Sequence, residues 1–251
     1  MYEATVSVDK VNGHLLDYVK EQLTPCMGEI DGITSEMDER YRNYFSLACA
    51  DTYRFQVQRK LSDAVSQALT LGYKNIYVRK LLRIDKNNFY QNVLVNTICI
   101  FDNEYDKQIV SRIIDVDKTL LCIDGYYNFR LGPIKKKWQE ITKLVSDNFY
   151  VLSDNTLIVE FLQYLLESTP SKCKELSVSV DGDKFVLYGN GDKVIEPTLS
   201  MAKMSSCEEE IMLNILWLKP KTVKIYHSRS LSKDFCDMMN ELFQTEYIEV
   251  E

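Results

Sequence analysis

The chain has 251 residues, of which 45% are hydrophobic, so it can form one large domain or two small ones around a substantial core. Its formal net charge of −7 disfavours general binding to nucleic acids or anionic membranes, which would need a local basic patch. No apolar run approaches the length of a membrane span, and the first residues lack the pattern of a signal peptide. We therefore expect neither a membrane span nor export.

The first third of the chain predicts a strand followed by helices. Apolar side chains from Val57 to Leu71 recur at alternating spacings of four and three, which favours a long helix that ends at Gly72. In chain order we expect a strand, a short helix, an acidic loop, the long helix and a further helix, over residues 2–8, 14–19, 24–39, 39–71 and 76–84.

The middle of the chain contains one ambiguous stretch and two clear amphipathic helices. Residues 88–123 are ambiguous because the run Val93–Phe101 is compatible with a strand or with a buried helix. Pro133 is well placed as the first residue of a helix, and Asp154 is a candidate N-cap of the next. Both helices carry apolar side chains at helical spacing, so we expect them to pack against a core.

The character of the sequence changes around residue 168, where alternating patterns replace helical ones. We predict a mainly helical domain with a short N-terminal strand over residues 1–168 and a small α/β domain over residues 169–251. In the second domain we expect a three-stranded meander over residues 176–196. The predicted fold class is α+β.

Two helices and two strands are expected after the meander. The segment Ser205–Glu209 has the spacing of a capping box, which predicts a helix start. A strand over residues 222–227, a helix capped by Ser232 and a strand over residues 247–250 should follow. This order implies a parallel pair of strands.

Motifs of established catalytic chemistry are missing from the sequence. The two histidines, His14 and His227, are far apart and form no zinc-hydrolase motif. His227 closes a predicted strand, where α/β folds place ligand groups, but a structural role is favoured. There is no phosphate-binding glycine loop and no serine-hydrolase elbow, and Gly189–Gly191 is typical of a turn. We therefore expect no catalytic residue, no cofactor and no bound metal.

Seven cysteines are scattered along the chain without a C-x-x-C pair. An odd, unpatterned set in a chain of this length predicts reduced thiols that act as small buried hydrophobes. The cysteines are Cys26, Cys49, Cys99, Cys122, Cys173, Cys207 and Cys236.

Three charged groups of residues are candidate sites. The carboxylates Asp115, Asp117 and Asp124 are close enough in sequence to converge on a hard cation, although loop positions and helix-end caps in an acidic protein are favoured. Lys74 to Arg83 carries four cations and no acid, and a solvated helix face is favoured there over a nucleic-acid site.

The third group surrounds the helix start at Pro133. Cations at a helix N-terminus oppose the helix dipole, and together with the free backbone amides they would form an anion site. The favoured alternative is a solvated face paired with acids. The residues of this hypothetical anion site are Arg130, Lys135, Lys136 and Lys137.

A run in the middle of the chain resembles a known family. The segment Ile123–Leu131, followed by a helix, Asp147–Phe149 and Phe161–Leu166, is similar to the central signature of the YtxC sporulation proteins. Residues 110–251 carry the resemblance, although Gly132–Pro133 departs from the usual helix start. The motif residues are Asp124, Gly125, Asn128, Phe129, Arg130 and Leu131.

The resemblance implies a role in endospore formation in a Firmicute and a cytosolic location, but no reaction. We therefore expect a non-catalytic interaction or regulatory protein that binds one or more protein partners. The competing hypothesis is a protein or enzyme that binds an anion or a phosphorylated ligand through the segment Arg130–Lys137. The sequence identifies neither the partner nor the oligomeric state.

Overall fold

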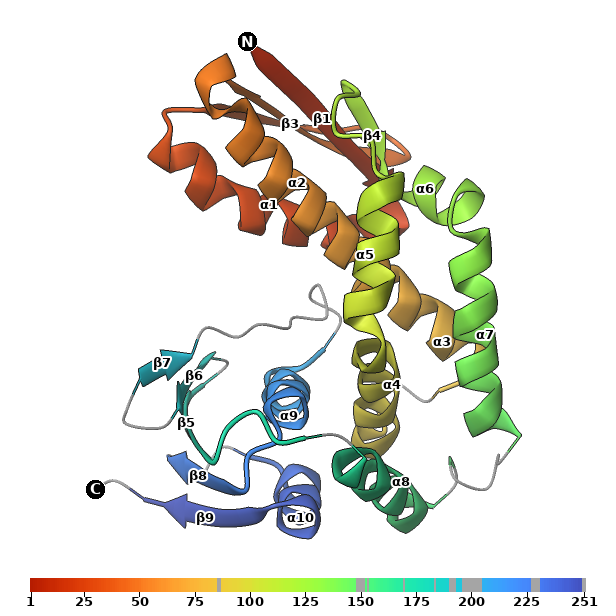
Figure 1. Cartoon of the computed structure of the whole chain (residues 1–251), viewed down its shortest axis with the longest axis vertical. Coiled ribbons are helices and arrows are strands. Elements are labelled where there is room, and N and C mark those ends of the chain that lie inside the picture. The colour runs from red at the N-terminus through yellow and green to blue at the C-terminus, as the bar shows by residue number, and fades with distance from the viewer. Residues whose placement is uncertain are drawn as a thin grey trace. The chain divides into compact units, whose positions relative to one another are not determined.

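The structure of the chain is a computed structural model (Figure 1). It describes residues 1–84, 87–147, 152, 154–168, 170–182, 184–189, 193–195, 205–226 and 231–249. The described residues form two compact units. The first unit contains Met1–Val78 and Phe101–Glu140, and the described residues of the second unit come from Arg79–Ile100, Ile141–Met201 and Ser205–Glu251.

The first unit combines a four-stranded sheet with helices. Its strands are β1 (Tyr2–Asp9), β2 (Ile33–Asp38), β3 (Arg42–Cys49) and β4 (Leu120–Cys122). Its helices are α1 (Gly13–Glu29), α2 (Arg54–Gln67), a π-helical segment (Ala68–Tyr73), α5 (Asn103–Ile113), α6 (Ile123–Phe129) and the first parts of α3 (Lys74–Leu82) and α7 (Gly132–Ser146). Two single 3-10 turns, Lys10–Asn12 and Asp51–Tyr53, precede α1 and α2.

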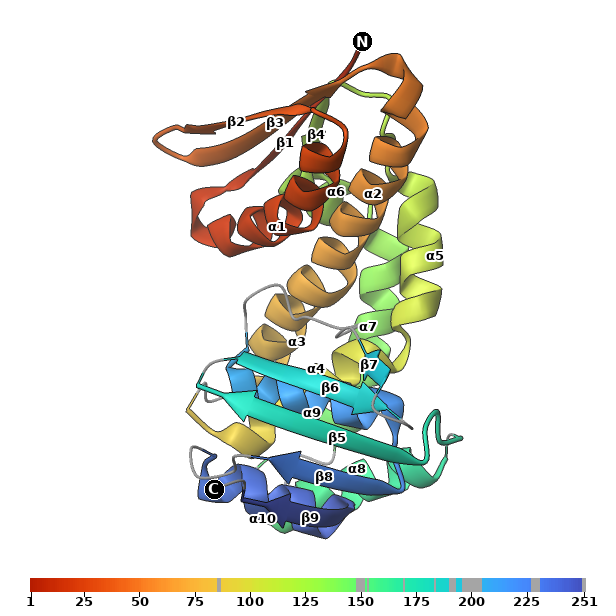
Figure 2. The same cartoon turned by 90° about the vertical axis from the view of Figure 1, so that its left-hand side faces the viewer.

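The sheet of the first unit has the order β2-β3-β1-β4. β3 is antiparallel to both β1 and β2, and β4 is parallel to β1. Helices α1 and α2 lie on one face of the sheet (Figure 2). The covered face is apolar because residues of β1, β3 and β4 on that face point into the core: Ala4, Val6, Val8, Phe45, Leu47 and Leu121.

Two predictions for the first unit were wrong. The expected acidic loop contains the end of α1 and strand β2, and the first part of the expected long helix is strand β3. Burial of Leu23, Cys26 and Met27 keeps α1 helical beyond Pro25, which overrides the local preference for a break. Strand β2 is exposed at all six positions, so its sequence shows no alternation and only pairing with β3 defines it.

Gly72 was also wrongly predicted to end a helix. It lies inside the π-helical segment, which continues α2 into α3 without a break. All six residues of the segment are buried, so tertiary packing compensates for the conformational cost of glycine.

The second unit is a five-stranded sheet with helices. Its strands are β5 (Glu175–Asp181), β6 (Lys184–Gly189), β7 (Lys193–Ile195), β8 (Thr222–Tyr226) and β9 (Gln244–Ile248), in the order β7-β6-β5-β8-β9. Its helices are α4 (Phe89–Phe101), α8 (Asn155–Glu167), α9 (Cys207–Leu218) and α10 (Lys233–Leu242). The ambiguous run Val93–Phe101 is thus helical, and Val93–Val95 and Ile98–Ile100 of α4 are buried.

Most predictions for the second unit are confirmed. β5, β6 and β7 form the antiparallel meander, and β8 and β9 are parallel with α10 between them in the chain. Gly182 turns β5 into β6 with a φ of 57°, a conformation that glycine adopts without a steric penalty. The caps are also as predicted, because Asp154, Ser206 and Ser232 each accept a hydrogen bond from a backbone amide of the helix they precede.

The chain therefore has an α+β fold with a helical N-terminal region, as predicted, but that region also contains a four-stranded sheet. Among the described residues, no helix is both long enough and apolar enough to cross a bilayer. Three predictions concern residues outside those that the structure describes. They are the predictions for His227, for Asn148 and Phe149 of the family-like segment, and for the turn at Asn190–Gly191.

Candidate functional site

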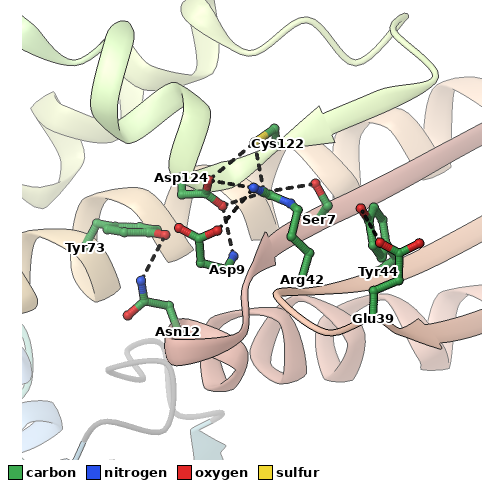
Figure 3. Close-up of polar contacts among 9 residues, drawn as sticks. All are labelled: Ser7, Asp9, Asn12, Glu39, Arg42, Tyr44, Tyr73, Cys122 and Asp124. Carbon is green, nitrogen blue, oxygen red and sulfur yellow. Dashed lines mark hydrogen bonds and ion pairs between the residues drawn. The ribbon is translucent and has the colours of Figure 1, made fainter.

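A buried carboxylate and a guanidinium join the sheet of the first unit to α6 (Figure 3). Arg42, on the face of β3 that α1 and α2 leave uncovered, donates from Nη2 to Asp124 Oδ1 at 2.7 Å and from Nη1 to Asp124 Oδ2 at 3.2 Å. The two bonds make a bidentate pair, which is the strongest geometry for these groups. Asp124 lies in the first turn of α6 and is only 7% exposed.

Three further residues complete this polar cluster. Arg42 Nη1 also donates to Asp9 Oδ1 at 3.2 Å, and Nη2 lies 3.0 Å from Cys122 Sγ and 3.4 Å from Ser7 Oγ. The backbone amide of Asp9 donates to Asp124 Oδ1 at 3.0 Å. Burial alone would lower the pKa of Arg42, but the hydrogen bond and the charge of Asp124 outweigh burial and raise it. The cluster thus fixes the ends of β1, β3 and β4 around one cation.

Gly125, the second residue of the family-like motif, has a packing role beside this cluster. A Cβ atom at this position would lie 3.0 Å from Cys122 Sγ and 3.3 Å from Cys122 Cβ. Any larger side chain would therefore require the Cys122 side chain to shift by a few tenths of an ångström. Close approach of the helix to the strand explains why glycine stands here.

Tyrosines continue the contacts along α6. Tyr127 stacks on Tyr73 with a distance of 4.4 Å between ring centroids, and Asn12 Nδ2 donates to the Tyr73 hydroxyl at 3.4 Å. Burial, followed by the charge of Asp124, raises the pKa of Tyr73, so its hydroxyl stays protonated at neutral pH. The Tyr126 hydroxyl accepts a hydrogen bond from the Asp115 amide at 3.2 Å.

Three residues near the end of the family-like motif are exposed to solvent, in contrast to its first residues. Asn128, Phe129 and Arg130 are exposed at the C-terminal end of α6, and Phe129 is 85% exposed. Leu131 returns to the core and is fully buried. The motif therefore consists of residues that attach α6 to the fold and of three consecutive residues that face solvent.

The four cations of the predicted anion site have different surroundings. Lys135 Nζ lies 4.1 Å from the centroid of the Tyr127 ring, and burial lowers the pKa of its ammonium group. Lys137 Nζ lies 3.2 Å from Asp102 Oδ2 and 3.9 Å from the centroid of the Tyr105 ring. Arg130 and Lys136 are exposed. The structure thus gives Lys135 and Lys137 separate neighbours.

The three carboxylates considered as a cation site also have separate partners. Asp117 accepts hydrogen bonds from Arg54 at 2.6 Å and from Gln58 at 2.8 Å, whereas Asp124 pairs with Arg42. Asp115 Oδ1 accepts a hydrogen bond from the Asp117 backbone amide at 3.3 Å. Within the part of the chain that the structure describes, no group of three or more histidine, cysteine or acidic side chains could hold a metal ion.

A buried ion pair in the first unit was not predicted. Lys74 Nζ and Asp106 Oδ2 are 2.9 Å apart, both side chains are fully buried, and Trp138 Nε1 donates to the same oxygen at 2.8 Å. The interpretation of Lys74 as part of a solvated face was therefore wrong. A lysine at the end of an otherwise apolar stretch, Ala68–Tyr73, was the signal in the sequence, but nothing local identifies Asp106 as its partner.

The second unit contains a smaller buried polar cluster. Glu209 accepts a hydrogen bond from Asn92 Nδ2 at 2.8 Å and forms a capping box with Ser206. Arg79 donates to Asn92 Oδ1 at 2.5 Å, so this cation of the basic segment is also not simply solvated. Burial raises the pKa of Glu209, and burial lowers the pKa of Arg79.

The comparison with family models decides the relationship. The model of the YtxC-like family matches residues 74–246, which is more than half of the chain. The chain belongs to the YtxC-like family. The match begins well before residue 110, where the resemblance in the sequence was expected to start, and it includes Lys74, Asp106 and Asp124 but not Arg42. No curated protein and no solved structure matches the chain.

Proposed function

We propose that the protein is a non-catalytic interaction or regulatory protein that acts in the cytosol of a sporulating cell and binds a protein partner through Phe129. The proposal rests on one observation: an aromatic side chain of the YtxC-like motif is 85% exposed at the end of a helix that Asp124 and Tyr127 attach to the fold. The process and the compartment come from the family, whose sporulation role is the expectation stated above.

The surroundings of Phe129 suit a protein contact. Covering an exposed phenylalanine contributes about 1.5–3 kcal/mol, and aromatic and arginine side chains are enriched where binding energy is concentrated in interfaces. Asn128 and Arg130 flank the ring and are exposed themselves, so they can supply polar contacts around an apolar centre. Asp124 and Tyr127 hold the helix in place, which reduces the entropy lost on binding.

A pair of matched variants tests this function. Phe129→Ala at the native locus should lower the number of heat-resistant spores by at least about tenfold if the lost contact is a binding hot spot. Phe55→Ala is the control, because Phe55 is 79% exposed in α2, outside the motif. Both variants should accumulate to the wild-type level in immunoblots. Equal spore counts for Phe129→Ala, Phe55→Ala and wild type would remove the proposal.

The alternative is that the protein binds an anion or a phosphorylated ligand at the start of α7. One observation favours it: Arg130 and Lys136 are exposed, and the first turn of α7 contains no acidic residue. Titration calorimetry with inorganic phosphate and with a nucleotide tests it, using Lys135→Glu and Lys136→Glu and the exposed Lys60→Glu as a control. Heat that disappears only in the first two variants supports the anion site, and no heat with the wild-type protein ends it.

A further inference from the structure

Strand β2 is an edge strand with unusual exposure. Among the described residues it pairs only with β3, and all six of its residues, Ile33–Asp38, are exposed. Ile33 is 71% and Met37 is 53% exposed. An edge of this kind offers a row of backbone donors and acceptors to a further strand.

The hairpin between β2 and β3 determines which backbone groups face outward. The Glu39 amide donates to the Arg42 carbonyl at 2.9 Å, so Glu39 and Arg42 form a hydrogen-bonded pair. Hydrogen-bonded and non-hydrogen-bonded pairs alternate along an antiparallel ladder. Ile33, Ser35 and Met37 therefore direct their backbone groups to β3. The backbone amides and carbonyls of Thr34, Glu36 and Asp38 point away from the sheet.

Strand β2 has neither proline nor a bulge, two features by which proteins prevent strand pairing. Its register with β3 is continuous from Ile33 to Asp38. Its two carboxylates are neutralised within the chain, because Glu36 lies 2.6 Å from Lys20 Nζ and Asp38 lies 2.7 Å from Lys10 Nζ. The alternate face of the strand carries Ile33, Ser35 and Met37 and no charge.

We propose that β2 pairs antiparallel with β2 of a second copy of this chain, around a two-fold axis that passes through Ser35. In this register Ile33 lies opposite Met37 of the second copy, and each apolar residue covers the other on both sides of the axis. Thr34 lies opposite Glu36 of the second copy, and these residues exchange both backbone hydrogen bonds.

Self-complementarity selects this occupant and this register. An axis at Glu36 would place the two Glu36 carboxylates opposite each other, which is unfavourable. An axis at Thr34 would place Ile33 opposite a serine and leave Met37 uncovered. Only the axis at Ser35 pairs the two exposed apolar side chains and separates the like charges, and it joins two four-stranded sheets into one.

Disulfide crosslinking tests the register. Two Ser35 residues would form a non-hydrogen-bonded pair, with Cα atoms about 4.5 Å apart, which a disulfide can bridge. Under mild oxidation, Ser35→Cys should give a covalent dimer well above the wild-type background of the native thiols. Met37→Cys is the control on the same strand and face, because the two Met37 positions lie about 13 Å apart. A mixture of Ile33→Cys and Met37→Cys should again give dimers.

Sedimentation velocity over a concentration series tests the contact without a crosslink. The wild-type protein should form dimers, and Thr34→Pro should shift the equilibrium to monomers, because it removes an outward amide without removing a bond to β3. Circular dichroism checks that this variant is folded. A wild-type protein that stays monomeric, equal crosslinking of Ser35→Cys and Met37→Cys, or an unchanged dimer of folded Thr34→Pro would each overturn the proposal. None of these results depends on Phe129.

Discussion

Within each unit, the stabilising contacts join residues at different separations in the sequence. In the first unit, Arg42 bonds Asp124 across 82 residues of sequence, Lys74 bonds Asp106 across 32, and the Tyr2 hydroxyl donates to the Val116 carbonyl across 114. In the second unit, the caps of α9 and α10 connect residues three apart, and the meander connects neighbouring strands. Long-range charged contacts therefore stabilise the first unit, whereas the second unit combines these local contacts with a hydrogen bond from Asn92 to Glu209 across 117 residues.

The largest effect should come from the buried ion pair of the first unit. Asp106→Ala leaves the Lys74 ammonium buried without its carboxylate and should lower the free energy of unfolding by about 3–5 kcal/mol. Urea unfolding, followed by Trp138 fluorescence in a Trp217→Phe background, measures it. Asp63→Ala is the control, because Asp63 pairs with Lys107 at 3.5 Å at the surface and should contribute less than about 1 kcal/mol. Similar losses for both variants would contradict a special role of the buried pair.

A smaller effect is expected at the junction of the sheet and α6. Asp124→Ala removes a bidentate hydrogen bond to Arg42 and should cost the first unit about 2 kcal/mol. A double-mutant cycle with Arg42→Met should give a coupling of about 1–3 kcal/mol. Asp117→Ala is the matched control, because Asp117 pairs with Arg54 at 2.6 Å but both side chains are largely exposed. A coupling near zero would show that the sheet does not depend on this contact.

The local contacts of the second unit should each contribute less. Ser206→Ala and Ser232→Ala each remove a helix N-cap and should cost about 1 kcal/mol. Trp217 fluorescence in a Trp138→Phe background follows unfolding of this unit. Ser168→Ala, at the exposed C-terminal end of α8, should change stability by less than about 0.5 kcal/mol. A cap variant as damaging as Asp106→Ala would break the contrast between the two units.

The smallest expected effect is a pH dependence of the second unit. Burial raises the pKa of Glu209 above its ordinary value of 4.5, so the folded unit retains a proton that the unfolded chain releases. Stability should therefore fall as the pH rises from about 4.5 through the folded pKa. Glu209→Gln should remove this slope in thermal unfolding followed by Trp217, and the exposed Glu160→Gln should keep it. An unchanged slope in Glu209→Gln would show that another group is responsible.

The same contrast explains how much of the fold the sequence reveals. Caps and strand alternation in the second unit follow from residues that are close in sequence, and Asp154, Ser206 and Ser232 were identified from such patterns. β3 was missed although Phe45, Leu47 and Cys49 alternate in burial, because the helical periodicity after Val57 was extended too far back. The separation into domains at residues 168 and 169 stays a prediction, which limited proteolysis can test.

The candidate site was only partly predictable for the same reason. The motif around Asp124 could be identified, but its partner Arg42 lies in a strand that was interpreted as helix and precedes the family match. The exposure of Phe129 depends on how α6 ends against the core, which no local pattern specifies. The cations from Lys135 to Lys137 were identified as a group, whereas the rings near them come from α5 and α6 and the carboxylate of Asp102 comes from the residue before α5.

Helix α6 has only seven residues. Helices of this length are not stable alone in water, so its conformation depends on what its side chains contact elsewhere. Its first turn is fixed through Asp124 to a strand, and its solvent end carries Phe129. A ligand that must order that end in order to bind is thereby linked thermodynamically to Arg42, because weakening the guanidinium contact raises the entropy lost on binding and should lower affinity at a ring that Arg42 does not contact.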